Sequence, residues 1–276
     1  MKVINGKAIA QSLRLQLKEK IALLPTKPGL AVVIVGEDPA SQIYVRNKIK
    51  ACGEVGINSF SYELPATVSQ TQLNALLDEL GENKGVHGIL LQLPLPKGLN
   101  AEEAARHIPV EKDVDGFSAE NLGKLLQGKA KIAACTPSGV MQILQAEGVC
   151  LKGKHAVVLG RSETVGKPMA MLLLNADATV TVCHSKTENL TEICKQADIL
   201  ISAVGIAKFV KNEMVKQDAV VIDVGINRDE NGKLCGDVDF ENVCEKCSLI
   251  TPVPGGVGPM TITMLMYNTY LAFVKE

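Results

Sequence analysis

A tyrosine and a lysine on the first long predicted helix are placed to do chemistry together. Tyr44 and Lys48 are four residues apart in SQIYVRNKIKAC, so they share one face of a helix. Burial of a lysine beside an aromatic ring can lower its pKa enough for it to transfer protons at neutral pH. The alternative is a surface lysine whose aliphatic stem covers an apolar stripe. The spacing alone leaves both interpretations open.

Polar side chains also stand at and after a later apolar segment. Gln92 interrupts ILLQLPLP, and a buried amide costs free energy unless it finds hydrogen-bond partners. It is therefore either bonded to nearby backbone or held for a ligand at the carboxyl end of a parallel strand. Asp113 and Asp115 follow in EKDVDGF. They are either part of a solvated turn or helix cap, or a carboxylate that accepts two N–H groups from a flat heterocycle.

A loop rich in proline and glycine, TPVPGGVGPMT over residues 251–261, precedes the last predicted helix. Glycines allow backbone to approach a ligand closely, and prolines keep a loop stiff. The loop is either a ligand-binding segment or a plain turn into the helix.

The segment VVLGRSETVGKP, residues 157–168, has the order strand, glycine turn and helix with which dinucleotide-binding loops begin. It departs from the G-x-G-x-x-G pattern, because Ser162 replaces the second glycine and the closing glycine comes one place late at Gly166. Gly160 can still make the turn, and Arg161 places a positive charge beside a phosphate. An ordinary strand–helix turn is the alternative.

The following strand indicates which nucleotide is bound. NAD-binding folds usually end this strand with a carboxylate that binds the ribose 2′-hydroxyl. Here ATVTVCHSKT ends with His184, Ser185 and Lys186, and the first carboxylate is Glu188. Hydroxyl and cationic groups favour a 2′-phosphate, so the sequence predicts NADP rather than NAD. A polar strand end without a ligand is the alternative.

The elements that position these residues alternate between strands and helices. The first half has apolar strands at 29–36, 57–64 and 86–96, and the second half has HAVVLG, ATVTVCH, DILISAVG and AVVIDVGI. The helix at 38–56 begins with Asp38 and Pro39. Repeated βα units imply parallel sheets. The predicted fold class is α/β, with two α/β domains and a cleft between them, the second domain being a Rossmann-type doubly wound parallel sheet.

Composition excludes several classes of protein. The 276 residues are 46% hydrophobic and 21% charged, with a net charge of −1, which gives no general attraction to nucleic acid or anionic membrane. No apolar run approaches the roughly 20 residues of a membrane span, and no secretory signal is predicted, so we expect a cytoplasmic protein. The eight cysteines are expected to be reduced. CEKC at 244–247 has no second ligand pair, and no metal site is predicted.

Taken together, the motifs resemble one enzyme family. They occur in the order seen in the bifunctional methylenetetrahydrofolate dehydrogenase/methenyltetrahydrofolate cyclohydrolase family, and the resemblance covers nearly the whole chain. The matching segments are YVRNKIK, GILLQLPLP, EKDVDGF, CTPSGV, GRSETVGKPMA, CHSKT, VIDVGIN, GDVDF and PVPGGVGPMT. Ala134 and Thr164 depart from the family pattern, which often has proline and isoleucine there. Neither change removes a group that the chemistry needs.

The resemblance implies a two-step enzyme that oxidises 5,10-methylenetetrahydrofolate with NADP and then hydrolyses the methenyl product to 10-formyltetrahydrofolate. Lys48 would be the principal catalytic group and Gln92 would tune it, while Tyr44 would stack on the folate and Asp115 would bind the pterin edge. The other folate contacts implied are Pro254, Gly255, Gly256, Gly258, Pro259 and Thr261. The NADP contacts implied are Gly160, Arg161, Ser162, Gly166, Ser185 and Ile226.

The resemblance also implies a domain division and a homodimer formed through the nucleotide domain. Residues 1–138 with 260–276 would form the folate-binding catalytic domain, and 139–259 the NADP-binding Rossmann-type domain. Rival interpretations are a dehydrogenase without cyclohydrolase activity, an NAD-dependent enzyme, another NADP oxidoreductase acting on a shikimate-like acid, and a non-catalytic folate- or nucleotide-binding sensor. A non-catalytic sensor would be expected to lack some of the catalytic side chains, yet every residue implied by the resemblance is present.

Overall fold

The structure is a computed structural model that describes residues 1–274, apart from the side chains of residues 39, 40 and 43. The chain forms two compact units. Unit 1 comprises Met1–Gln11 and Thr136–Thr261, and unit 2 comprises Ser12–Cys135 with the segment that starts at Ile262. The first eleven residues therefore group with the second half of the chain, whereas the sequence analysis assigned them to the first domain.

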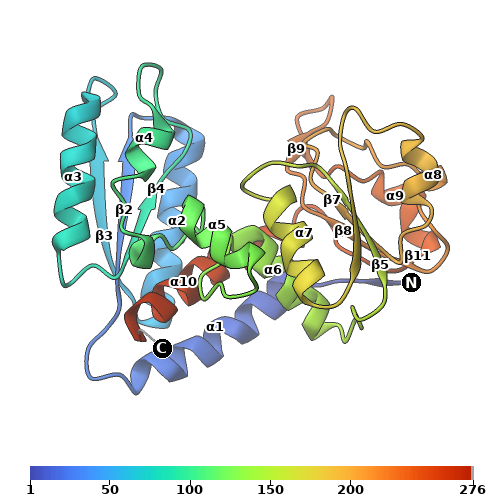
Figure 1. Ribbon diagram of the computed structural model, residues 1–276, viewed down its shortest axis with the longest axis horizontal. Coiled ribbons are helices and arrows are strands. Elements are labelled where there is room, and N and C mark those ends of the chain that lie inside the picture. Colours follow the sequence, from blue (N-terminus) through green and yellow to red (C-terminus); the bar gives the residue numbers. More distant parts are fainter. Residues whose placement is uncertain (275–276) are drawn as a thin grey trace. The chain divides into compact units, whose positions relative to one another are not determined.

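Unit 2 is built on a parallel three-stranded sheet of β2 (Gly29–Val35), β3 (Asn58–Leu64) and β4 (Gly88–Leu91), in the order β3-β2-β4. Helices α2 (Pro39–Val55) and α3 (Gln70–Glu82) cover opposite faces of this sheet (Figure 1). Every residue of β2 is buried, because alternate side chains pack into the two separate cores beneath these helices.

The limits of α2 follow from its end residues, as predicted. The Asp38 carboxylate accepts a hydrogen bond from the Ser41 N–H at 2.8 Å, which satisfies one of the unpaired donors of the first turn. Gly56 ends the helix in the left-handed region, with φ at +88°.

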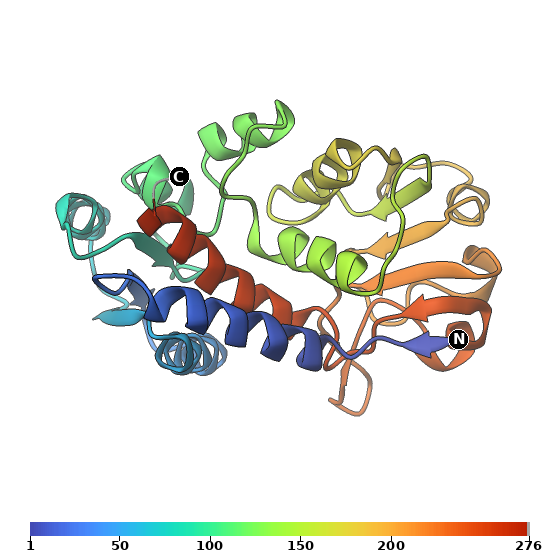
Figure 2. The ribbon, with the colours of Figure 1, turned by 90° about the horizontal axis from the view of Figure 1, so that it is seen from below.

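Two helices of the same length as α2 complete the core beside it. They are α1 (Gly6–Ala22) and α10 (Gly258–Val274), and Figure 2 shows them side by side. In unit 2 they are joined by a hydrogen bond from Lys20 Nζ to the Tyr267 hydroxyl at 3.1 Å. The shorter elements of unit 2 are α4 (Ala101–Ala105), η1 (Val110–Lys112) and α5 (Ala119–Leu126).

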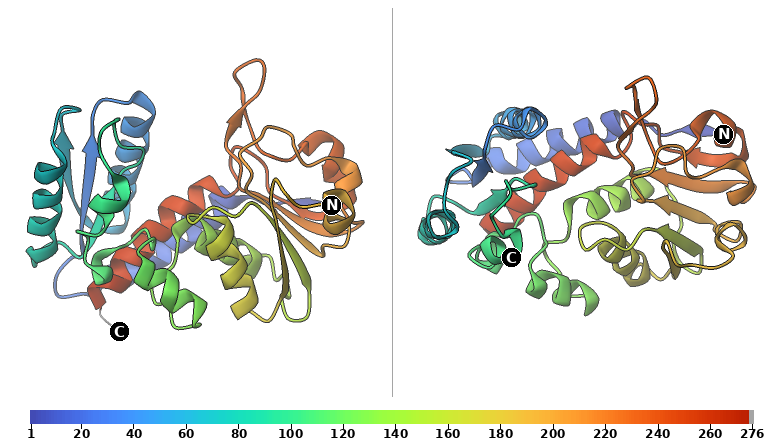
Figure 3. Two further views of the ribbon diagram at one scale, coloured as in Figure 1. Left: turned by 45° about the horizontal axis from the view of Figure 1, so that its top comes forward. Right: turned by 90° about the horizontal axis from the view of Figure 1, so that it is seen from above.

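Unit 1 contains a six-stranded sheet in which all pairs are parallel, in the order β1-β11-β8-β7-β5-β6. Its strands are visible in the two views of Figure 3. The four predicted strands are β5 (His155–Leu159), β6 (Thr179–Cys183), β7 (Ile199–Ser202) and β8 (Ala219–Asp223). The sequence analysis did not predict β1 (Lys2–Val3) or β11 (Cys247–Ile250).

Helices cover both faces of this sheet. Val157 and Leu159 of β5 belong to a core that includes side chains of α8 (Leu190–Cys194) and α9 (Phe240–Val243). The alternate residues Ala156 and Val158 point to the other face and are also fully buried. The predicted α/β fold class with a doubly wound second sheet is therefore confirmed. The remaining elements of unit 1 are α6 (Cys135–Ala146), α7 (Gly166–Asn175), η2 (Asn212–Met214), η3 (Cys244–Lys246), β9 (Asn227–Arg228) and β10 (Leu234–Cys235).

Candidate functional site

In unit 2 the predicted catalytic groups gather where the strand order reverses. The chain passes from β2 to β3 on one side and then returns to place β4 on the other side of β2. Ligands of open α/β sheets bind at the carboxyl ends of strands around such a reversal. Gln92 is the first residue after β4, and its backbone N–H donates to the Val33 carbonyl at 2.8 Å.

The side chain of Gln92 is fixed by two hydrogen bonds. Its Nε2 donates to the Leu93 carbonyl at 2.7 Å, which turns Oε1 toward α2. There Oε1 accepts a hydrogen bond from Lys48 Nζ at 2.9 Å. Lys48 is partly buried, while Tyr44, one helical turn earlier, is 44% exposed. The lysine is thus directed to a defined partner, and the tyrosine ring is available for a ligand.

Asp115 belongs to the same cluster of side chains. Burial raises the pKa of its carboxyl to about 6, and the nearby charge of Lys48 acts in the opposite direction. The negative charge of Asp113 raises this pKa further, and a hydrogen bond from Cys135 lowers it. The structure therefore brings Lys48, Gln92 and Asp115 together in unit 2.

Asp113 has a different environment from Asp115. Its Oδ1 accepts hydrogen bonds from the N–H groups of Gly116 and Phe117, at 3.0 and 3.3 Å. Its Oδ2 accepts from the Ser118 N–H at 2.8 Å and from Asn121 Nδ2 at 3.0 Å. For Asp113 the turn-forming interpretation is correct, since these four donors occupy both oxygens.

Two polar residues that are not predicted from the sequence lie against the loop that contains Asp113 and Asp115. Cys135 is buried, and burial raises the pKa of its thiol well above the ordinary value, so that it stays protonated. Asn268 of α10 is 2% exposed and donates from Nδ2 to the carbonyls of Val114 and Ala133, at 2.8 and 2.9 Å. The only sequence signal for Asn268 is an amide within the apolar segment MLMYNTYLA.

The proline- and glycine-rich loop belongs to unit 1 and requires its glycines for steric reasons. Gly255 has φ at +103°, and a Cβ on Gly256 would lie 2.5 Å from the Pro252 carbonyl oxygen. The Thr261 hydroxyl lies 3.0 Å from the Thr136 hydroxyl, within hydrogen-bond distance. The substrate residues predicted from this loop therefore lie in unit 1, whereas Tyr44 and its partners lie in unit 2.

A second candidate site is a pocket of about 350 Å³ in unit 1. It lies at the carboxyl ends of β5, β6 and β7, where the strand order of this sheet reverses. Gly160 has φ at +113°, and a Cβ there would lie 2.3 Å from the Ala203 carbonyl oxygen. A Cβ on Gly166 would lie 2.2 Å from the Gly160 carbonyl oxygen, so the turn requires both glycines. The pocket is lined by Leu159, Gly160, Arg161, Ser162, Cys183, His184, Ser185, Leu190, Ala203, Val204, Ile206 and Phe209.

The polar groups of this pocket fit a nucleotide with several phosphates. The Ser162 hydroxyl oxygen accepts hydrogen bonds from the N–H groups of Val165 and Gly166, at 3.2 and 3.3 Å, which leaves its proton free to donate. Arg161 and Ser185 also line the pocket, and none of its lining residues is a carboxylate. Because a carboxylate would repel a 2′-phosphate, this donor set matches NADP. The two other predicted contacts, Gly166 and Ile226, are not among the lining residues, and Ile226 is 56% exposed after β8.

A fully buried aspartate shapes one wall of the nucleotide pocket. Asp237 accepts hydrogen bonds from the N–H groups of Val204 at 2.7 Å and of Ile206 at 3.1 Å. Its neighbour Asp223 is also buried and accepts three backbone N–H groups, one of them from Asp237 itself. Burial raises the pKa of Asp223 to about 6. Neither aspartate is among the site residues predicted from the sequence.

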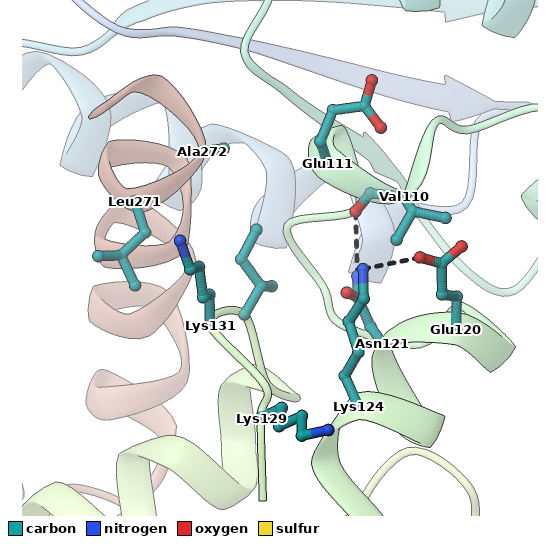
Figure 4. Close-up of a pocket in the computed structure, with 10 residues that line it drawn as sticks. Val110, Glu111, Glu120, Asn121, Lys124, Lys129, Lys131, Leu271 and Ala272 are labelled. Carbon is teal, nitrogen blue, oxygen red and sulfur yellow. Dashed lines mark hydrogen bonds and ion pairs between the residues drawn. The ribbon is translucent and has the colours of Figure 1, made fainter. Parts of the chain in front are cut away.

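A further pocket of about 560 Å³ lies in unit 2 beside α5 and the end of α10 (Figure 4). Lys124 pairs with Glu120 at 2.7 Å, and Asn121 Nδ2 donates to the Val110 carbonyl at 3.1 Å. None of the predicted site residues lines this pocket. The full lining is Val110, Glu111, Glu120, Asn121, Lys124, Lys129, Lys131, Ile132, Leu271 and Ala272.

Within residues 1–274, no group of three or more histidine, cysteine or acidic side chains is arranged to hold a metal ion. No helix in this part of the chain is long and apolar enough to cross a membrane.

Comparison with known proteins identifies the family. Residues 4–115 match the tetrahydrofolate dehydrogenase/cyclohydrolase catalytic domain, and residues 134–276 match the NAD(P)-binding domain of the same family. The "Bifunctional protein FolD" of Magnetococcus marinus is 56% identical over 97% of this chain and 95% of its own. The bifunctional FolD enzyme of Campylobacter jejuni has a similar structure, with a TM-score of 0.97, 48% identity and complete coverage of both chains. The FolD structure from Trypanosoma brucei, complexed with NADP and an inhibitor, has a TM-score of 0.94 and 42% identity over 99% of this chain and 97% of that one. The chain belongs to the bifunctional methylenetetrahydrofolate dehydrogenase/methenyltetrahydrofolate cyclohydrolase family.

Proposed function

We propose that this chain oxidises 5,10-methylenetetrahydrofolate to the methenyl cation with NADP and then hydrolyses that cation to 10-formyltetrahydrofolate. The observation that carries the proposal is the Lys48–Gln92 hydrogen bond of 2.9 Å beside the partly exposed Asp115 carboxylate, whose pKa is raised. The nucleotide pocket without a carboxylate supports NADP as the cofactor of the first step. Both steps are those of the family to which the chain belongs.

When bound, NADP would supply the acceptor for the hydride that leaves the methylene carbon of the substrate in the first step. The protein's contribution is alignment, because the cofactor carries the redox chemistry. The Ser162 hydroxyl and the Arg161 guanidinium would bind phosphate oxygens, and Ser185 would lie beside the 2′-phosphate. Ile226 and Gly166 would contribute backbone contacts to the cofactor.

In the second step water adds to the methenyl carbon, and the bond from that carbon to N5 breaks to leave the formyl group on N10. Lys48 Nζ is the group that would transfer the proton between water and the folate nitrogen. Gln92 Oε1 holds one N–H of this lysine, which directs the rest of the amino group. Asp115 would accept N–H groups from the pterin edge, and Tyr44 would stack on the folate. The loop residues Pro254–Thr261 would complete the folate contacts.

The test is to follow both steps separately in wild type and in Lys48→Met. The purified protein is mixed with 5,10-methylenetetrahydrofolate and either NADP or NAD, and reduced cofactor and methenyltetrahydrofolate are measured. Wild type should reduce NADP in preference to NAD with little accumulation of methenyltetrahydrofolate, whereas Lys48→Met should lose methenyl hydrolysis. Lys50→Met is the matched control, since Lys50 is exposed two residues further along α2.

Two outcomes would contradict the proposal. Absence of turnover with either cofactor in folded wild-type protein would favour the non-catalytic sensor. Turnover with persistent methenyltetrahydrofolate in wild type would leave a dehydrogenase without cyclohydrolase activity.

We also propose that the protein is a cytoplasmic homodimer formed through the nucleotide-binding unit, as the family resemblance implies. The support in the structure is that β6 is an edge strand whose Val182 is 39% exposed, next to α7, whose Leu174 is 51% exposed. Sedimentation equilibrium would test this part of the proposal. A mass near 29.4 kDa rather than about twice that value would contradict it.

A further inference from the structure

One buried amide joins the two loop segments that surround Asp115. Asn268 Nδ2 has two N–H groups and donates them to the carbonyls of Val114 and Ala133, at 2.8 and 2.9 Å. Val114 directly precedes Asp115. Within the described part of the chain, no backbone N–H donates to either carbonyl. Besides the weak Cys135 thiol donor at Val114, Asn268 is therefore the donor on which the conformation at these carbonyls depends.

The two segments are in close contact beside Asp115. A Cβ on Gly116 would lie 2.6 Å from the Ala133 carbonyl carbon, and Gly116 has φ at +74°. The Cys135 sulfur lies 3.3 Å from the Val114 carbonyl oxygen and 3.5 Å from Asn268 Nδ2. A small displacement of one segment must therefore move the other, and with it the backbone that carries the Asp115 carboxylate.

The two ends of this turn are anchored by different groups. Asp113 binds three backbone N–H groups on the far side of Asp115, from Gly116 to Ser118. Asn268 binds the carbonyl on the near side, from a helix 154 residues away in the sequence. The backbone on both sides of Asp115 is therefore held by side-chain hydrogen bonds.

We infer that Asn268 is a positioning residue for folate binding, which acts by holding the Asp115 carboxylate in the orientation that accepts the pterin edge. The inference rests on the proposed role of Asp115. Loss of the amide removes the donor of the Ala133 carbonyl and leaves the Val114 carbonyl with only the weak Cys135 thiol donor at 3.3 Å, so the turn rearranges to reach water or other donors. A carboxylate that accepts two N–H groups side by side is sensitive to such a rearrangement, because both bonds depend on its orientation.

The test compares the KM for 5,10-methylenetetrahydrofolate with the KM for NADP in Asn268→Leu, Asn268→Ser and Thr269→Val. Thr269 is the matched control, since it is also fully buried on α10 but donates to the Leu265 carbonyl of its own helix, at 2.8 Å. Asn268→Leu should raise the folate KM about tenfold, which corresponds to the loss of one good hydrogen bond, and leave the NADP KM within about twofold. Thr269→Val should leave both within about twofold.

A double-mutant cycle with Asp115→Ala separates positioning from a general structural effect. If Asn268 acts through Asp115, Asn268→Ser should raise the folate KM when Asp115 is present but change it little in the Asp115→Ala background. Equal effects of Asn268→Ser in both backgrounds would overturn the inference. So would an Asn268→Leu protein in which both KM values rise together. If Asn268→Leu fails to fold, Asn268→Ser, which keeps one donor, is read by the same criteria.

The cycle also distinguishes this inference from the proposal beneath it. An unchanged folate KM in Asp115→Ala alone would refute the role of Asp115, and with it the positioning role. A raised folate KM in Asp115→Ala with additive effects of Asn268→Ser would refute the positioning role only.

Discussion

The raised pKa of Asp115 makes the stability of unit 2 depend on pH in a calculable way. Burial raises this pKa from the ordinary value of 3.8 to about 6. The folded state therefore holds the Asp115 proton more tightly than the unfolded state does. The resulting cost to the free energy of unfolding is absent below about pH 4, grows as the pH rises, and is complete above about pH 6. At about 1.4 kcal/mol per pH unit the full cost is about 3 kcal/mol, and about half of it develops between pH 5 and pH 8.

Asp115→Asn keeps the size of the side chain and removes the ionisation. The mutant should therefore gain about 1–2 kcal/mol relative to wild type between pH 5 and pH 8. Urea unfolding followed by tyrosine fluorescence measures this gain. The protein has no tryptophan, and its four tyrosines, Tyr44, Tyr62, Tyr267 and Tyr270, all lie in unit 2, so the signal reports on that unit.

Two further variants sharpen this experiment. Glu82→Gln removes an exposed carboxylate of the same unit and serves as the control for a change in net charge. Lys48→Met removes the positive charge that lowers the pKa of Asp115, so the pH dependence should move to higher pH. A stability difference between Asp115→Asn and wild type that is constant from pH 5 to pH 8 would refute the reasoning. An unchanged pH dependence in Lys48→Met would show that the two charges do not interact.

Three other substitutions test the remaining parts of the two sites. Gln92→Met removes the acceptor of Lys48 Nζ and should lower the rate of methenyl hydrolysis at least about tenfold. The rate is measured by the disappearance of methenyltetrahydrofolate, and an unchanged rate would contradict a role of Gln92 in directing Lys48. Gly160→Ala places a methyl group 2.3 Å from the Ala203 carbonyl oxygen and should lower the free energy of unfolding by at least about 2 kcal/mol, measured by thermal unfolding. Gly153→Ala is the control, because Gly153 also has a positive φ but has open space around its Cβ, and it should lower the free energy of unfolding by less. Ser185→Asp adds a carboxylate to the nucleotide pocket and should raise the KM for NADP at least about tenfold, because the carboxylate repels the 2′-phosphate, and leave the KM for NAD unchanged. Equal effects on the two KM values would mean that the 2′-phosphate does not bind beside Ser185.

The parts of the fold that could be predicted are those whose cause is local. The strand β2 is a continuous apolar run because both of its faces are buried, and α2 has an aspartate cap and a terminal glycine. The strand β11 has only four residues and directly precedes the proline-rich loop, so the loop signal dominates the sequence there. Its place in the sheet is set by pairing with β1, about 247 residues away, and with β8. Such pairing leaves no periodic signal within the segment.

The same distinction holds for the candidate site. Lys48 could be selected because it shares a helix face with Tyr44, and the structure joins it directly to Gln92, which could be selected as a polar group in an apolar segment. Asn268 has the same local appearance, but its role depends on carbonyls 154 and 135 residues away. Asp237 similarly serves a loop more than 30 residues before it in the sequence. Residues that hold loops by bonding to distant backbone carry no spacing pattern that a single sequence could reveal.

Two aspartates in this protein share a pKa of about 6, and comparing them shows which property marks a ligand-binding carboxylate. Burial is the main cause of the raised pKa at both Asp115 and Asp223. The carboxylate oxygens of Asp223 accept three backbone N–H groups, so they are already occupied by hydrogen bonds within the protein. Asp115 is only partly exposed, and among the described residues its pKa is influenced by the charges of Lys48 and Asp113 and by a hydrogen bond from the Cys135 thiol, but by no backbone N–H. The carboxylate of Asp115 is therefore free to accept N–H groups from a ligand, and this property, rather than the raised pKa, supports the binding role proposed for Asp115.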